Sequence, residues 1–82
     1  MHLFPNPSNA SHLTIELLNA ELGPYELIIY DFLGKIHKLH KGIISDNNTY
    51  RLQLDISELA ESTYLIKIIH SKGSISSSFI KN

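Results

Sequence analysis

The stretch His12-Leu13-Thr14-Ile15-Glu16-Leu17-Leu18 alternates between polar and apolar side chains over most of its length. In an extended chain successive side chains point to opposite faces, so Leu13, Ile15 and Leu17 share one face. Alternation of this kind is typical of a β-strand with one face in a core and the other in solvent. Residues 12–18 therefore predict a half-buried strand and favour an all-β fold.

Further strand patterns lie on both sides of this stretch, separated by turn signals at the roughly 8–12-residue spacing of sandwiches and barrels. The segments are residues 2–4, 25–31, 35–41, 50–56, 63–70 and 74–81. Residues 25–31 are apolar on both faces, which predicts a central strand, whereas frequent polar residues place 35–41 near a sheet edge. We therefore expect residues 1–82 to form a single domain, an immunoglobulin-like antiparallel β-sandwich of about seven strands.

Two segments with turn-forming residues predict turns between these strands. Asp31-Phe32-Leu33-Gly34 predicts a hairpin turn, because an Asp side chain can bond the backbone two residues on and glycine accepts a left-handed conformation. Ser45-Asp46-Asn47-Asn48 predicts the next turn, which also explains its carboxylate and amides better than a calcium loop would.

The segments that flank the strands have simple structural interpretations as well. We expect Ser57 to cap a short helical turn and Leu59 to plug the end of the core. Pro5 and Pro7 fix their own φ angles and disfavour helix in the residue before each. They therefore predict an extended lead-in over residues 5–9.

Composition excludes several classes of function. The chain has seven basic and eight acidic residues, for a net charge of −1, which predicts no surface for nucleic acid. It has no cysteine, so a thiolate nucleophile, a thiolate-held zinc site and a disulfide are excluded. No apolar run approaches the roughly 18–20 residues of a membrane helix, and the N-terminus does not resemble a signal peptide. We therefore expect no stable membrane insertion, and we expect any export signal to lie elsewhere.

Candidate catalytic and metal-binding residues have ordinary explanations. His37 and His40 lie three residues apart on an expected strand, so their rings should point to opposite faces and could share a metal only across a bulge. No serine lies in a Gly-x-Ser-x-Gly turn. Asp31, Asp55 and Glu58 fit turn or cap positions, so they are not expected to act as paired catalytic carboxylates. We expect a non-enzyme without cofactor or metal.

Four landmarks occur in order along the chain: Phe4-Pro5-Asn6-Pro7-Ser8-Asn9, then Tyr30-Asp31-Phe32-Leu33-Gly34-Lys35, then residues 54–60 with 64–68, and finally Phe79-Ile80-Lys81-Asn82. In this order and spacing the chain resembles the type A C-terminal sorting domain of the type IX (Por) secretion system of Bacteroidetes. The resemblance covers essentially the whole sequence. One departure is Ser62, where the family usually has glycine, so the backbone there either avoids positive φ or is mildly strained.

The resemblance implies a secretion signal that follows a cargo domain. The cargo would cross the periplasm and reach the outer membrane surface or the medium. Its partners would be outer-membrane components of the type IX machinery, including a sortase-like peptidase. Most landmark residues are expected to serve folding rather than receptor contact. The candidate sorting-motif and recognition residues are Pro5, Asn6, Pro7, Asp31, Gly34, Asp55, Leu59, Tyr64, Lys81 and Asn82.

Recognition could use the last strand. An open sandwich leaves edge strands, so we hypothesise that residues 74–81 are recognised partly by strand addition, with Lys81 contributing charge. An alternative is an immunoglobulin-like adhesion or carbohydrate-binding module of a bacterial surface protein, which would require exposed, coplanar tyrosines. A purely structural spacer is a third interpretation. A sorting domain must end its natural protein at or very near Asn82, and this position distinguishes the first two interpretations.

Overall fold

The computed structural model describes residues 1–5, 11–46 and 49–82, and these residues form seven β-strands and no helix. The strands are β1 (His2–Phe4), β2 (His12–Leu18), β3 (Gly23–Tyr30), β4 (Ile36–Ile44), β5 (Thr49–Asp55), β6 (Ser62–His70) and β7 (Gly73–Lys81). No segment of the described chain qualifies as a membrane-spanning helix.

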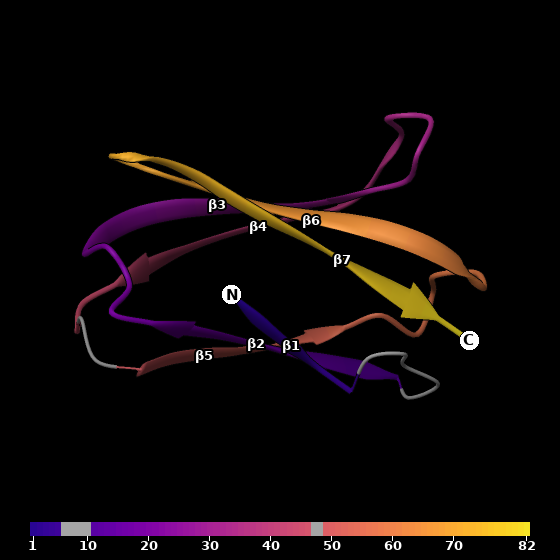
Figure 1. Ribbon diagram of the computed structural model, residues 1–82, viewed down its shortest axis with the longest axis horizontal. Coiled ribbons are helices and arrows are strands. Elements are labelled where there is room, and N and C mark those ends of the chain that lie inside the picture. Colours follow the sequence, from indigo (N-terminus) through magenta and orange to yellow (C-terminus); the bar gives the residue numbers. More distant parts are fainter. Residues whose placement is uncertain (6–10, 47–48) are drawn as a thin grey trace.

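The strands form two antiparallel sheets that face each other (Figure 1). One sheet has the order β1-β2-β5, and the other has the order β4-β3-β6-β7. The predicted all-β sandwich is therefore confirmed. β3 lies between β4 and β6, and β4 lies at an edge, as the apolar and polar patterns of these segments predict.

The core lies between the sheets and is built from the inward faces of their strands. In the three-stranded sheet the pairs Leu13–Leu54 and Ile15–Leu52 are in register across β2 and β5. The largest fully buried side chains come from both sheets and from the loop after β5: Leu13, Ile15, Leu27, Ile29, Ile56, Ile66, Ile68 and Phe79. Burial of each such side chain stabilises the fold by about 1.5–3 kcal/mol, so the two-layer arrangement follows from the alternation in the sequence.

Two tyrosines join the sheets near one end of this core. The Tyr25 and Tyr50 hydroxyls hydrogen-bond at 2.7 Å, and burial, followed by this bond, raises the pKa of Tyr25. The Tyr25 ring crosses Gly42 on β4 so closely that a Cβ at position 42 would lie 2.5 Å from the Tyr25 hydroxyl oxygen. Gly42 is therefore required for this crossing.

The loop after β5 differs from its prediction. The loop forms a single hydrogen-bonded turn and no helix, and the side chain that organises it belongs to Asp55, whose Oδ1 accepts a 2.9 Å hydrogen bond from the Ser57 amide. The expected cap at Ser57 is therefore wrong, because the preceding carboxylate takes that role. The amide of Leu59 donates to the Ile56 carbonyl at 3.1 Å, and Leu59 closes the end of the core as predicted.

Parts of two predicted segments lie outside the described residues. In the lead-in over residues 5–9, Pro5 is described and exposed, whereas residues 6–9 are not described. The turn at Ser45–Asn48 is described only as far as Asp46.

Candidate functional site

Landmarks that are distant in sequence lie together at one end of the sandwich, here called the hairpin end. It comprises residues 31–35, 55–61 and 81–82, at the right of Figure 1, with the β3–β4 turn at the upper right and the label C below it. The strand register agrees with the picture, because Tyr30 is opposite Leu65 and Ser62 is opposite Lys81. The sequence motifs therefore meet on one surface.

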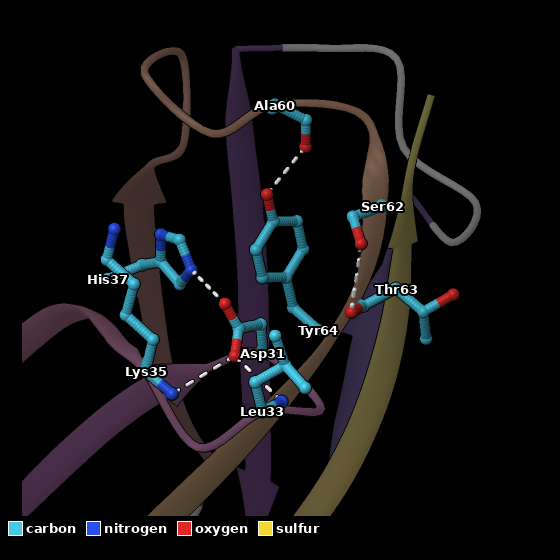
Figure 2. Close-up of polar contacts among 8 residues, drawn as sticks. All are labelled: Asp31, Leu33, Lys35, His37, Ala60, Ser62, Thr63 and Tyr64. Atoms are coloured by element: carbon cyan, nitrogen blue, oxygen red, sulfur yellow. Dashed lines mark hydrogen bonds and ion pairs between the residues drawn. The ribbon is translucent and has the colours of Figure 1, made fainter.

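The β3–β4 turn is organised by the Asp31 side chain. Its Oδ1 accepts hydrogen bonds from the amides of Leu33 at 2.9 Å and Lys35 at 3.0 Å, and its Oδ2 lies 2.9 Å from His37 Nε2 (Figure 2). The bond to His37, followed by those from the two amides, lowers the pKa of Asp31. Gly34 has a φ of +84°, a left-handed conformation that glycine adopts without strain. The predicted turn is confirmed at both positions.

A chain of aromatic contacts connects this turn to the core. The His37 ring packs edge-on against Tyr64 at 5.3 Å between centroids, and Tyr64 stacks on Phe79 of β7 at 5.5 Å. The Tyr64 hydroxyl donates a 2.6 Å hydrogen bond to the Ala60 carbonyl (Figure 2). The turn, the loop before β6 and the last strand therefore share one set of contacts.

The structure corrects the expected orientation of the two β4 histidines. The pairing of β3 with β4 shifts by one residue between Ile29 and Tyr30, which makes His37 an extra residue in β4. As a result, His37 contacts buried Tyr64, and His40 contacts buried Tyr25 at 6.1 Å between ring centroids. The predicted divergence of the rings to opposite faces is therefore wrong. Within the described residues, no three His, Asp or Glu side chains come together as a metal site.

An ion pair connects β4 to the loop after β5. Lys38 Nζ lies 3.2 Å from Glu58 Oε1, and both a hydrogen bond from Glu58's own backbone amide and the Lys38 contact lower the pKa of Glu58. The hydrogen bonds from Ser57 lower the pKa of Asp55. Asp55 therefore has the turn role that the sequence predicts for it, and Glu58 pairs with Lys38 of β4.

The remaining predicted residues have different degrees of exposure. Pro5 and Asn82 are exposed, Leu59 and Tyr64 are buried, and Lys81 is half-buried at the end of β7. Asn6 and Pro7 lie outside the described residues.

Serine replaces the usual glycine at position 62 without backbone strain. Among the described residues a positive φ occurs at Asn19 and at three glycines, and Ser62 is not among them. Of the two alternatives open at this position, the backbone avoids positive φ.

Sequence reasoning missed the exposure of the turn tip. Phe32 is 70% exposed and Leu33 is 95% exposed, although both are large and apolar. The sequence contained a signal, namely two large apolar residues at central turn positions, which are usually polar. Two apolar residues there need a reason other than turn geometry.

Two depressions lie at the other end of the sandwich. One of about 670 Å³ is lined by Pro24, Lys41, Ile43 and Ile69 among others, and one of about 310 Å³ by Leu17, Ala20 and Ile75 among others. Charged groups in the larger depression include Glu26 and Lys41, which lie 3.9 Å apart as a surface ion pair. Neither depression is lined by any of the candidate recognition residues that the structure describes.

The tyrosines do not form a platform for sugar rings. Tyr25 and Tyr64 are buried in the core, and Tyr30 and Tyr50 are half-buried. Carbohydrate stacking needs exposed aromatic faces, so this arrangement gives the alternative of a sugar-binding module no support.

Comparison with known proteins identifies the family. The model of the secretion system C-terminal sorting domain (Por secretion tail) matches residues 2–82, almost the whole chain. Comparison with curated proteins returned no match. The matched range includes every strand and all four landmarks. This chain therefore belongs to the family of type IX secretion system C-terminal sorting domains.

Proposed function

We propose that this chain is a non-catalytic signal that directs an attached cargo protein through the type IX secretion system. Family membership marks the chain as a sorting signal for export to the cell surface or the medium. In the proposed route the cargo precedes this domain, passes through the periplasm and is delivered across the outer membrane. The domain contributes a surface that another protein binds, and it performs no reaction itself.

The observation that carries this proposal is the gathering of the landmarks at the hairpin end. Asp31, Tyr64 and Lys81 are far apart in sequence, yet they lie on the turn, the start of β6 and the end of β7 that form this surface. A folding role explains the buried members. It does not account for Lys81 and Asn82, which are half-buried and exposed, and a binding role accounts for them better.

The last strand supports the same proposal through its edge position. β7 pairs with β6 on one side, and within the described residues no strand pairs with its other side. Edge strands can accept a further strand through backbone hydrogen bonds. We infer that an outer-membrane component of the machinery binds β7 partly in this way, and that a sortase-like peptidase acts on the chain before this domain.

A reporter fusion tests the proposal. A periplasmic reporter that carries this chain at its C-terminus should reach the surface or the medium in a host with the type IX system. It should stay in the periplasm of the same host without that system. Retention of the reporter in the periplasm of both hosts would contradict the proposed function.

Two variants separate recognition from folding. Deletion of residues 73–82 removes β7 and should block export, but it also removes the buried Phe79. Lys81→Ala leaves the core intact and should still reduce export, with Lys81→Arg as the matched control. Equal export of Lys81→Ala and the parent fusion would show that this residue takes no part in recognition.

A further inference from the structure

The β3–β4 turn carries an exposed apolar pair that the fold does not use. The turn stands clear of the sandwich, in magenta at the upper right of Figure 1. Phe32 and Leu33 lie at its tip, 70% and 95% exposed. Exposure of two adjacent large apolar side chains in a turn costs hydration free energy and gives the fold nothing in return. A contact outside this chain would account for them.

The tip is held rigidly. The Asp31 carboxylate bonds the amides of Leu33 and Lys35 and the ring of His37, and the Gly34 amide donates to the Asp31 carbonyl at 3.0 Å. The turn therefore has little conformational freedom to lose on binding. Preorganisation of this kind lowers the entropic cost of association.

The two charged side chains of the turn, Asp31 and Lys35, have different surroundings. The negative charge of Asp31 faces His37 and two amides within the turn. In the part of the chain that the structure describes, the exposed Lys35 ammonium has no ion-pair partner. A partner surface would therefore meet an apolar pair beside one cation.

Apolar surface continues from the tip along the outer face of the four-stranded sheet. Ile36 and Leu39 on β4 are 59% and 55% exposed, and they lie opposite Tyr30 and Ile28 of β3. The outer face of β7 carries Ser74, Ser76 and Ser78, followed by Ile80, which is 45% exposed. The most exposed apolar side chains near this end therefore lie on the turn and on β4, whereas the outer face of β7 is mainly polar.

We propose that the Phe32–Leu33 tip inserts into an apolar pocket, rimmed by a carboxylate that pairs with Lys35, on a protein of the secretion machinery. This inference rests on the proposed function and adds a second contact to the one at β7. A protein pocket fits better than a lipid surface, because aromatic anchors in pockets carry much of the affinity of protein interfaces. Membrane binding draws on a broad apolar face and several basic residues, and this chain has a net charge of −1.

The test uses the reporter fusion in the secreting host. Phe32→Ser with Leu33→Ser should lower the exported fraction by about tenfold, the usual effect of losing an interface anchor. Phe32→Leu should keep most of the export. Lys35→Glu should reduce export, whereas Lys35→Arg, which keeps the positive charge, should be exported like the parent. Leu18→Ser, on the other sheet and also at a position 70% exposed, is the matched control and should export normally.

Two further measurements identify the partner class. A photo-crosslinking residue at position 32 should capture a subunit of the type IX machinery, and the same residue at position 18 should not. Vesicles of neutral and of anionic phospholipid should not bind the chain. Vesicle binding that disappears with Phe32→Ser would overturn the protein pocket in favour of a lipid surface.

The outcomes distinguish this inference from the proposed function. Normal export of the double serine variant, with the parent fusion also exported, would overturn the tip contact and leave the sorting function intact. Failure of the parent fusion to be exported in either host would overturn both. The unfolding midpoint of the double variant should match that of the parent, because neither side chain is in the core.

Discussion

The hydroxyl of Tyr64 donates a 2.6 Å hydrogen bond to the carbonyl oxygen of Ala60, four residues earlier in the chain. Tyr64 lies near the start of β6, directly after the loop that crosses from one sheet to the other. Immunoglobulin-like sandwiches use the same device, a tyrosine corner, to fix such a crossing. In this chain the corner also supports the hairpin end, because His37 packs against the same ring.

Removal of this hydroxyl should destabilise the fold without changing its packing. Tyr64→Phe leaves the Ala60 carbonyl without its partner, which costs about 1–2 kcal/mol of unfolding free energy. Urea denaturation of the variant and the parent measures the difference. Tyr30→Phe, on the half-buried outer face of β3, is the matched control and should change stability by less than about 0.5 kcal/mol. Equal losses in the two variants would contradict a specific role for the corner.

The crossing of Tyr25 over Gly42 predicts a steric effect. Gly42→Ala would place its Cβ 2.5 Å from the Tyr25 hydroxyl oxygen and 2.7 Å from two ring carbons, so the buried ring must move. Overpacking of this kind costs about 1–3 kcal/mol. In a Tyr25→Leu background the clashing atoms are absent, so the added cost of Gly42→Ala should fall well below that value. Additive losses in the double variant would show that the crossing does not constrain position 42.

The carboxylates at the hairpin end predict acid sensitivity. The pKa of Asp31 is lowered in the fold, first by His37, so the stability from this group is present above the pKa of the unfolded chain, about 4. That stability is lost as pH falls through the lower folded value. Asp31→Asn should therefore be less stable than the parent near neutral pH, and its unfolding free energy should fall less steeply below about pH 4. Parallel pH profiles for the two proteins would contradict this coupling.

Much of the fold could be predicted because its signals are local. Alternation in residues 12–18 gives β2 with the observed bounds, and the apolar faces of residues 25–31 place β3 in the centre of its sheet. The ends of the strands were less predictable. β5 stops at Asp55 because that carboxylate bonds the next turn, and β4 continues to Ile44 because it pairs with Gly23.

The arrangement of the candidate site depends on contacts between distant segments. The extra residue His37 in β4 has no local signal, since it accompanies the contacts with Asp31 and Tyr64. The meeting of the landmarks at one end likewise follows from the strand order, which alternation does not determine. The exposed Phe32 was visible in the sequence, but its meaning depends on burial, which the fold determines.

The last strand gives the sharpest separation between a folding role and a recognition role. Phe79 is 1% exposed and stacks on Tyr64, so Phe79→Ala should lower the unfolding free energy by about 3–5 kcal/mol. A loss of that size approaches the whole stability of a small domain, so export of this variant should fail because the domain unfolds. Ser76→Ala, on the exposed face of the same strand, should keep both stability and export. Lys81→Ala should keep stability and lose export, which is the combination that only a binding role produces. Urea denaturation and reporter export, both measured on these three variants, distinguish a folding role from a recognition role. If Lys81→Ala lost stability together with export, Lys81 would be assigned to folding.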